Sequence, residues 1–293
     1  MMWGIPFPDE LCDAVAARGM TAVAQTDVNG FYGLLWFLEA ARQKHLRPIV
    51  GAELRHNGDR AVLLARSWEG YRRICRLLTE KHMNPDFQTA PALSDLPEDV
   101  FVLTDTLALL RCLAGRKTVF AELKPGAANH RLAKEAETLG LETVATASAC
   151  LADAGQAPVH RLLRAIFHNT TLAQVPPQDV APADFRLWDG ANMKRLFETF
   201  PRAVENASRI AGQCRTEWTF SETIFPAFET GGHQRSFSLL KEKCLAGIPR
   251  RYGRATPQVM GRLNHELEII EEKRFADIFL IVADVVAQSS LTC

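Results

Sequence analysis

Short apolar segments alternate with helical patterns through the first 150 residues, and this alternation limits the possible folds more than any other feature of the chain. Strand-like runs such as TAVAQ, AVLLA and DVFVLT are each followed by a stretch with apolar residues three or four positions apart. This order predicts parallel strands with helices outside them, as in an α/β barrel or a doubly wound sheet. In both architectures, functional residues gather at the carboxyl ends of the strands.

A tight turn interrupts this series. Residues His56 to Asp59 read His-Asn-Gly-Asp between the runs RPIVGAEL and AVLLA, and Asn-Gly between apolar runs is a strong hairpin signal. Further strands are predicted at 99–104, 117–123 and 142–148. Beyond residue 150 the pattern becomes helical, and the stretch TEWTFSETIFPAFETGG is typical of a boundary between domains.

Two carboxylates lie at the carboxyl ends of predicted strands, where functional residues are expected. Asp27 lies just after the first predicted strand, and Glu53 lies at the end of the second, where a barrel would hold a divalent metal. Hydrolytic two-metal sites generally recruit histidines as well. The eight histidines form no H-x-H, H-x-x-x-H or H-E-x-x-H pattern, so the metal signal is weak. There is also no phosphate-binding G-x-x-x-x-G-K-[ST] loop, no G-x-G-x-x-G and no G-x-S-x-G elbow. We interpret Cys150 as a small buried hydrophobic residue.

Charge is balanced overall and divided locally. The 34 basic and 34 acidic residues argue against a histone-like binder of nucleic acid. Residues 241–262, however, carry six basic side chains against Glu242 alone, and they surround Tyr252. They could neutralise phosphates and stack on a base, or they could form a solvated helix end and loop. The sequence leaves both interpretations open.

The sequence has no cysteine-pair motif, signal-peptide pattern or membrane-length apolar run, and these features bear on its cellular compartment. Its seven cysteines form no C-x-x-C pair, which favours a reducing, cytosolic environment without a disulfide framework. The N-terminus has no signal-peptide pattern. The longest apolar run, 278–287, is far short of the roughly 20 residues that a membrane span needs. We therefore expect no membrane association.

Several collinear motifs carry a family resemblance. The chain resembles the PHP (polymerase and histidinol phosphatase) domain of bacterial C-family DNA polymerases, the polymerase III alpha-subunit and error-prone group, in TAVAQTDVNGFYGLLWFLEAARQKHLRPIVGAEL and ETVATASACLADAGQAPVHRLLRAIFHNTTL. Its later segments MKRLFETFPRAVENASRIAGQC, FPAF and GIPRRYG through RLNHELEIIEEKRFADIFLIVADVV resemble the PHP exit and the start of the polymerase palm. The resemblance implies a PHP-type distorted (β/α)7 barrel lacking its first strand at 1–226. It implies a helical segment that opens the palm at 227–293.

The departures from the family concern the metal site. Family members with a working site begin with an H-x-H strand shortly before the glycine that matches Gly4, and this chain starts inside that motif. The family's T-D-H reads Thr26-Asp27-Val28, and its N-D-V-H is replaced by ASAC at 147–150. Only Asp27 and Glu53 remain as metal ligands, and we expect this vestigial pair to be unoccupied. Asp27 would then accept backbone hydrogen bonds from the NGFYG turn.

The resemblance implies a fragment, truncated at both ends, of a cytoplasmic DNA polymerase acting in replication or lesion bypass. The parent would bind primer–template DNA, deoxynucleoside triphosphates and Mg²⁺, and its PHP domain would contact a proofreading exonuclease or other replication proteins. The family's G-R-G-S-A loop and palm carboxylates would follow where this sequence stops, at Thr292-Cys293. We therefore expect no catalytic residue and no cofactor in this chain. Arg250, Arg251 and Arg254 are the candidates for phosphate contact.

Two alternatives stay open. The chain could be a free-standing, metal-dependent PHP phosphoesterase or 3′–5′ exonuclease with a reduced Zn²⁺ or Mn²⁺ site. It could also be an interaction module that docks a replication protein. A further expectation concerns stability: an open barrel edge and an exposed apolar helix at Ile278 to Val286 would promote aggregation.

Overall fold

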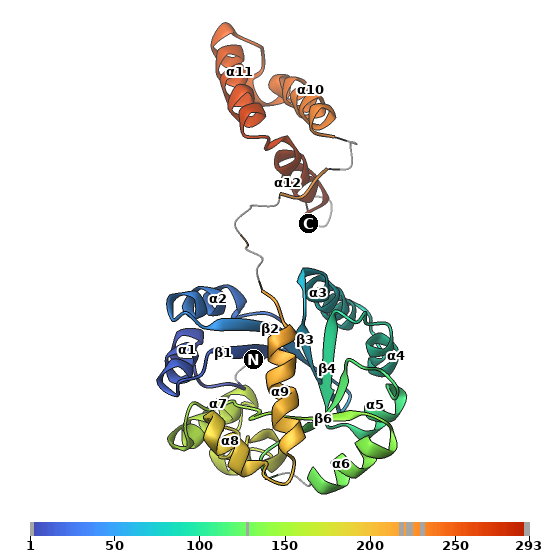
Figure 1. The fold of residues 1–293 in the computed structure, drawn as a ribbon. Coiled ribbons are helices and arrows are strands. Elements are labelled where there is room, and N and C mark those ends of the chain that lie inside the picture. The colour runs from blue at the N-terminus through green and yellow to red at the C-terminus, as the bar shows by residue number, and fades with distance from the viewer. Residues whose placement is uncertain (1–2, 127–128, 217–219, 221–224, 229–231, 290–293) are drawn as a thin grey trace. The chain divides into compact units, whose positions relative to one another are not determined.

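A computed structural model describes residues 3–126, 129–216, 220, 225–228 and 232–289. The chain divides into two compact units, residues 1–218 and 219–293, which Figure 1 shows and which we describe one at a time. Most of the expected boundary stretch at 216–232 lies outside the described residues.

The first unit is built on a six-stranded mixed sheet whose strands follow one another in chain order. The predicted α/β class is confirmed. Pairing is parallel between β1 and β2, between β4 and β5, and between β5 and β6. The strands are β1 Ala22–Val28, β2 Arg47–His56, β3 Asp59–Ala65, β4 Val100–Thr104, β5 Val119–Leu123 and β6 Glu142–Ala145.

Strand β3 runs antiparallel to both of its neighbours. The predicted hairpin is confirmed, because His56 pairs with Asp59 across a two-residue turn with Asn57 and Gly58 at positive φ. The parallel pairing expected for the rest of the series does not extend to this strand, as the predicted hairpin requires, since a tight turn can join only antiparallel strands. As a result, the start of β3 lies at the same edge as the carboxyl ends of its neighbours.

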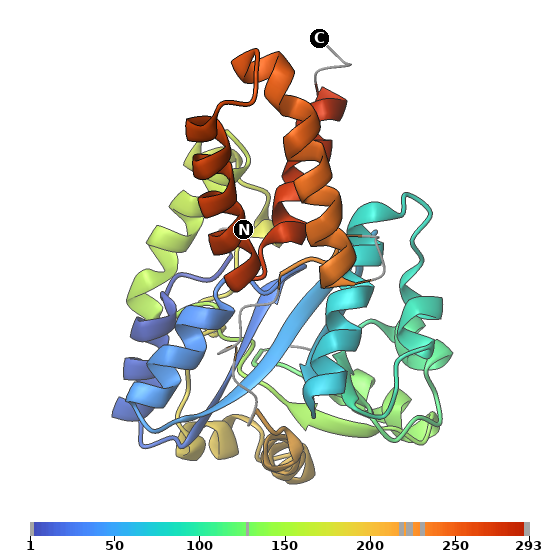
Figure 2. The same ribbon diagram turned by 90° about the horizontal axis from the view of Figure 1, so that it is seen from above.

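Helices cover the outer face of the sheet, as the alternation predicts (Figures 1 and 2). Residues of α1 and α2 share a buried cluster with β1 and β2. Residues of α3 to α6 share a larger cluster with β2 to β5. Their bounds are α1 Pro8–Ala17, α2 Leu34–Gln43, α3 Trp68–Met83, α4 Thr89–Ser94, α5 Leu107–Cys112 and α6 Asn129–Thr138.

The remainder of the first unit is helical, as the sequence indicates after residue 150. It contains α7 Ala157–Phe167, α8 Gly190–Leu196 and α9 Pro201–Gln213, with three short 3-10 turns at Ala154–Gln156, Leu172–Gln174 and Pro177–Asp179. Between β6 and α7 the chain makes an isolated bridge from Leu151 to Arg186, and the Ile5 N–H donates to the Cys150 carbonyl oxygen over 2.8 Å.

The inner face of the sheet changes from apolar to polar along the strands. Alternate residues of a strand share a face. Toward the amino ends of the parallel strands, this face packs apolar side chains against Ile210 of α9. They include Ile49, Leu64, Phe101, Phe120 and Val144. Toward the carboxyl ends, the same alternation brings charged residues onto the inner face. The site described below occupies this polar edge.

The second unit consists of three helices, α10 His233–Tyr252, α11 Pro257–Glu272 and α12 Ala276–Ser289. Its core contains Leu240, Leu267, Ala276 and Leu280, and Leu263 and Ile270 of α11 pack against it. The expected exposed apolar helix is confirmed in α12, where Phe279, Val282 and Val285 are about half exposed or more. Among the described residues, no helix is long and apolar enough to cross a membrane.

Candidate functional site

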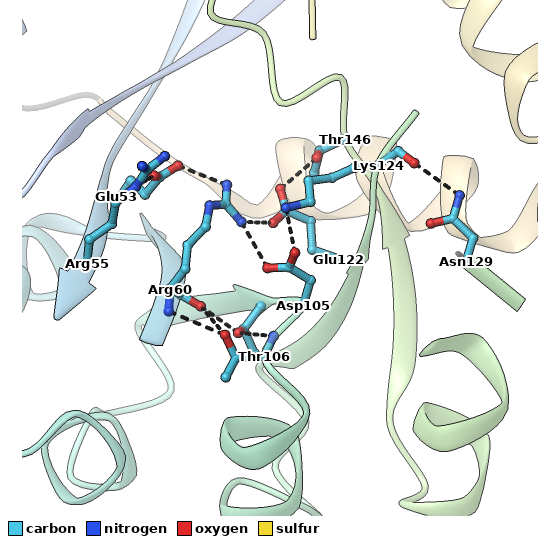
Figure 3. Close-up of polar contacts among 10 residues, drawn as sticks. Glu53, Arg55, Arg60, Asp105, Thr106, Glu122, Lys124, Asn129 and Thr146 are labelled. Carbon is cyan, nitrogen blue, oxygen red and sulfur yellow. Dashed lines mark hydrogen bonds and ion pairs between the residues drawn. The ribbon is translucent and has the colours of Figure 1, made fainter. Parts of the chain in front are cut away.

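Charged side chains from four strands converge at the carboxyl edge of the sheet (Figure 3). Glu53 lies near the end of β2, Asp105 directly after β4, and Glu122 near the end of β5. We call these three carboxylates the rim. Arg60, the second residue of β3, lies among them because the hairpin returns the chain to this edge. The expectation that charged site residues lie at the carboxyl ends of the strands therefore identifies the correct edge of the sheet.

Arg60 contacts all three rim carboxylates. Its Nη2 lies 2.8 Å from a Glu53 oxygen, its Nη1 donates to Glu122, and the same Nη1 lies 3.4 Å from an Asp105 oxygen. The Arg60 side chain is 15% exposed and that of Glu122 only 1%. Burial alone would lower the pKa of Arg60, but the charges of Glu122 and Glu53 outweigh it and raise the pKa above its ordinary value. Arg60 is therefore permanently charged.

Lys124 and Arg55 complete the charge balance. Lys124 follows β5, and its Nζ lies 2.5 Å from the second Asp105 oxygen, while Arg55 donates to the second Glu53 oxygen. Burial would raise the pKa of Asp105, but the charges of Lys124 and Arg60 outweigh it and lower that pKa. Three carboxylates thus face three cationic side chains, and the edge is neutral without any added ion.

Hydrogen bonds also orient the Glu122 carboxylate and the Arg60 backbone. The Thr146 hydroxyl, directly after β6, donates to a Glu122 oxygen over 2.6 Å. The Thr104 hydroxyl donates to the Arg60 carbonyl oxygen over 2.6 Å, and the Arg60 N–H donates to the Thr106 hydroxyl over 3.3 Å. Both the backbone and the side chain of Arg60 are therefore held by neighbouring strands (Figure 3).

Asp27 is not among the partners of Arg60. It lies inside β1, which continues to Val28 and is longer than the sequence suggests. Its carboxylate accepts the Gly33 N–H over 2.7 Å and the Gln25 side-chain amide over 3.2 Å. The expected backbone hydrogen bond from the NGFYG turn is therefore present. A Cβ on Gly33 would lie 2.2 Å from the Gln25 amide nitrogen, so a larger residue there would displace the Gln25 side chain from Asp27.

The donor atoms of the two predicted metal ligands already have partners. Both Glu53 oxygens accept from guanidinium groups, and Asp27 accepts from amides. A metal ion bound to Glu53 would lie next to two arginine charges and would be repelled by them. Within the described ranges, no group of three or more His, Cys, Asp or Glu side chains could hold a metal ion. The residues present do not fit the metal site that the family implies.

The predicted phosphate-contacting arginines lie in the second unit, around a turn between two helices. Arg250 and Arg251 occupy the last turn of α10, and Arg254 follows Gly253, whose φ of 74° ends the helix. All three are exposed, and none forms an ion pair within the described part of the chain. We call these three residues the basic turn. Other cations of the basic stretch do have partners: Lys243 lies 3.4 Å from Asp284, and Arg262 pairs with Glu266.

Cys150 is buried, as we interpreted it from the sequence. Its thiol donates to the Phe185 carbonyl oxygen over 3.3 Å, and burial raises its pKa to about 12. At neutral pH this thiol is protonated and a poor nucleophile. The six described cysteines are all free, in agreement with the absence of a disulfide framework.

Five charged side chains of this site escaped the sequence analysis: Arg55, Arg60, Asp105, Glu122 and Lys124. A signal that could have found some of them is a charged residue at two-residue spacing from the inward-facing residues of a predicted strand, because such a residue lies on the same face. In the run KTVFAELK, Glu122 and Lys124 follow Phe120 at two-residue spacing. Arg60 was missed because the predicted strand AVLLA begins one residue after it, whereas β3 begins at Asp59.

Comparison with family models gives two matches. A model of the PHP domain matches residues 1–146. A model described as the bacterial DNA polymerase III alpha NTPase domain matches residues 238–291. The first match covers all six strands and the whole rim, and the second covers the basic turn and α11.

Curated relatives agree with both models. The chain is 30% identical to an error-prone DNA polymerase of Symbiobacterium thermophilum, over 95% of this chain and 30% of that protein. It is 27% identical to an error-prone DNA polymerase of Mycobacterium bovis, over 96% and 30%. It is 23% identical to the DNA polymerase III subunit alpha of Bacillus subtilis, over 94% and 27%. The chain therefore spans less than a third of the length of these relatives.

Proposed function

We propose that this chain, which belongs to the PHP-bearing family of bacterial error-prone DNA polymerases and DNA polymerase III alpha subunits, is a non-catalytic part of such a polymerase. The observation that carries the proposal is the relationship over about 95% of the chain, which includes both matched regions. In this proposal the PHP-like barrel domain extends over 1–226, and the start of the palm extends over 227–293.

The whole polymerase would extend primers on a DNA template in the cytoplasm, with deoxynucleoside triphosphates as substrates and Mg²⁺ as cofactor. Within it, the first unit would act as a structural and docking domain for a proofreading exonuclease or another replication protein. The internally neutralised rim supports a structural role, because its carboxylates are already bound to Arg60, Arg55 and Lys124.

The basic turn would contact the DNA backbone. Arg250, Arg251 and Arg254 are exposed and lie close together in sequence at one helix end, so three positive charges face solvent without an internal counter-charge among the described residues. Each neutralised phosphate of duplex DNA releases condensed counterions and adds about 0.9 to the slope of log affinity against log salt. Tyr252, which is 62% exposed, adds an aromatic surface on which an unpaired base could stack.

The test is binding of the full chain to a fluorescent primer–template duplex, measured by anisotropy between about 50 and 200 mM salt. Replacing Arg250, Arg251 and Arg254 by Ala should weaken binding about tenfold or more at low salt and reduce the salt slope by roughly 2 to 3. The matched control is Arg262→Ala, because Arg262 is already paired with Glu266.

Two results would contradict the proposal. Equal affinity and equal salt slope for the triple variant and the wild type would remove the assigned DNA contact. Stoichiometric zinc or manganese in the purified chain, lost together with phosphatase or exonuclease activity in an Asp27→Ala, Glu53→Ala double variant, would instead establish a metal-dependent hydrolase.

A further inference from the structure

We propose that the first unit binds a small organic phosphate at the amino ends of β4, β5 and β6, on the opposite edge of the sheet from the rim. A cavity of about 380 Å³ lies there, between these strands and the end of α9. Arg116, Lys117 and Arg209 line it, and we call it the amino-end pocket. The inference goes beyond the proposed function, and it uses no residue of the rim or of the basic turn.

One wall of the amino-end pocket is the last turn of α9, which is fixed against β6 (Figure 1). The Asn206 side-chain amide, which is buried, donates to the Thr143 carbonyl oxygen of β6 over 2.8 Å. Nearly one turn later, Arg209 pairs with Glu142, the first residue of β6. Because these contacts hold the helix to the strand, the position of Arg209 beside the cavity is set by the fold.

The charge of the amino-end pocket is not balanced, in contrast to that of the rim. Arg116 donates to the Ser94 and Leu96 carbonyl oxygens, which are neutral groups. Lys117 is exposed, and its ammonium group bonds to no partner in the described ranges. Arg209 pairs with Glu142, the one carboxylate that lines the cavity. Three cations against one carboxylate leave a net charge of two positive.

Helix capping explains only part of this cluster. Ser94 is the last residue of α4, and basic side chains often bond to the last carbonyl oxygens of a helix, as Arg116 does here. Lys117 has no such bond among the described residues. The carboxyl end of a helix carries only about half a negative charge, so it leaves positive charge in the cavity for another anion.

The lining of the cavity indicates which kind of anion fits. A phosphate monoester carries about 1.5 to 2 negative charges at pH 7, which matches the net charge of the pocket, and guanidinium groups suit phosphate oxygens. The apolar side chains of Phe120, Leu141 and Ile210 also line the cavity, so an apolar body attached to the phosphate would leave water there. The volume lies near the lower end of the roughly 300–1,000 Å³ that is usual for small-molecule sites. The ligand class is therefore a small aryl or nucleoside monophosphate.

The experiment is titration of the full chain with phenyl phosphate, measured by isothermal titration calorimetry at about 50 mM salt and neutral pH. We expect saturable binding with a dissociation constant of about 1 mM or lower. Inorganic phosphate lacks the apolar body and should bind roughly threefold more weakly or worse. Phenol lacks the phosphate and should show no binding. Adenosine monophosphate is titrated in parallel, and the tighter of the two esters identifies an aryl or a nucleoside source.

Three variants test the assignment to the amino-end pocket. Lys117→Ala removes an exposed cation and should weaken phenyl phosphate binding about fivefold or more. Glu142→Gln removes the one lining carboxylate and should strengthen binding about threefold, which damage to the fold would not do. The matched control is Lys194→Ala, an exposed lysine of α8 that does not line the cavity, and its affinity should equal that of the wild type.

Several results would overturn the inference. They are no saturable binding of either ester to the folded wild type, equal affinity of Lys117→Ala and the wild type, and inorganic phosphate binding as tightly as phenyl phosphate. Weaker binding of primer–template DNA by Lys117→Ala, with phenyl phosphate binding unchanged, would make this surface a DNA contact instead. The DNA test of the basic turn uses variants of the second unit, so failure of either proposal can be recognised alone.

Discussion

The rim and the basic turn each bring three cationic side chains together, and they treat them in opposite ways. At the rim, Arg60, Arg55 and Lys124 are bound to carboxylates of the same unit. At the basic turn, Arg250, Arg251 and Arg254 are exposed and unpaired among the described residues. The difference teaches that burial decides where a counter-charge must come from. A buried cation needs one inside the fold, whereas an exposed cation can do without one and can stay available to an external anion, as at the basic turn.

The largest effect should come from removing a buried carboxylate. Glu122→Gln keeps the shape of the side chain but leaves Arg60 without its most buried partner, and we expect a loss of about 3–5 kcal/mol in the free energy of unfolding. Four of the five tryptophans lie among the described residues of the first unit and none lies in 219–293, so tryptophan fluorescence during urea unfolding reports mainly on the first unit.

The control for this change is Glu142→Gln on the adjacent strand. Glu142 pairs with Arg209, but both side chains are about half exposed. Exposed ion pairs contribute about 0–1 kcal/mol, so this variant should lose no more than that. Equal losses for the two variants would show that burial does not separate the two kinds of ion pair.

The next effect should come from Asp27. Asp27→Ala leaves the Gly33 N–H and the Gln25 amide without their shared acceptor, and losing such partly exposed hydrogen bonds costs about 0.5–1.5 kcal/mol. We expect the loss in the free energy of unfolding to fall in this range and to be the same in chelator and in Mn²⁺. Destabilisation that chelator alone reproduces in the wild type would assign Asp27 to a metal instead.

A smaller effect should appear in acid. The pKa of Asp105 is lowered in the folded state, so its contribution is complete above the pKa of the unfolded side chain, about 3.9. That contribution is lost as the pH falls through the lower folded pKa. Unfolding free energy measured from pH 6 to pH 3 should therefore fall less steeply for Asp105→Asn than for the wild type. Parallel pH curves for the two proteins would contradict the role of Lys124 and Arg60 at this carboxylate.

The smallest effect on stability should come from the basic turn. Replacing Arg250, Arg251 and Arg254 by Ala should change the free energy of unfolding of the second unit by about 0.5 kcal/mol or less for each position, because each side chain is exposed. Circular dichroism at 222 nm during thermal unfolding measures this. A loss of several kcal/mol would mean that the turn has a structural role, and the contrast with the rim would fail.

Local patterns in the sequence were enough to predict most elements but not the charge network. The hairpin at His56 to Asp59 has its own turn signal, and the Asp27 interaction lies within seven residues of chain. Arg60 and Glu122 are 62 positions apart and meet only because β3 is reversed. The predicted hairpin already gives this reversal, but the predicted strand AVLLA begins at Ala61, one residue after Arg60. Of the rim, only Glu53 was therefore identified, although the correct edge was found.

The two-residue turn before β3 also makes the rim sensitive to insertions. Side chains of a strand alternate between its two faces, so one extra residue at Asn57-Gly58 that slipped the pairing by one position would turn Arg60 outward, into the apolar layer formed with α3. Three carboxylates would lose a cation without any change of composition. The length of this turn is therefore as strict a requirement of the rim as the identity of the arginine that follows it.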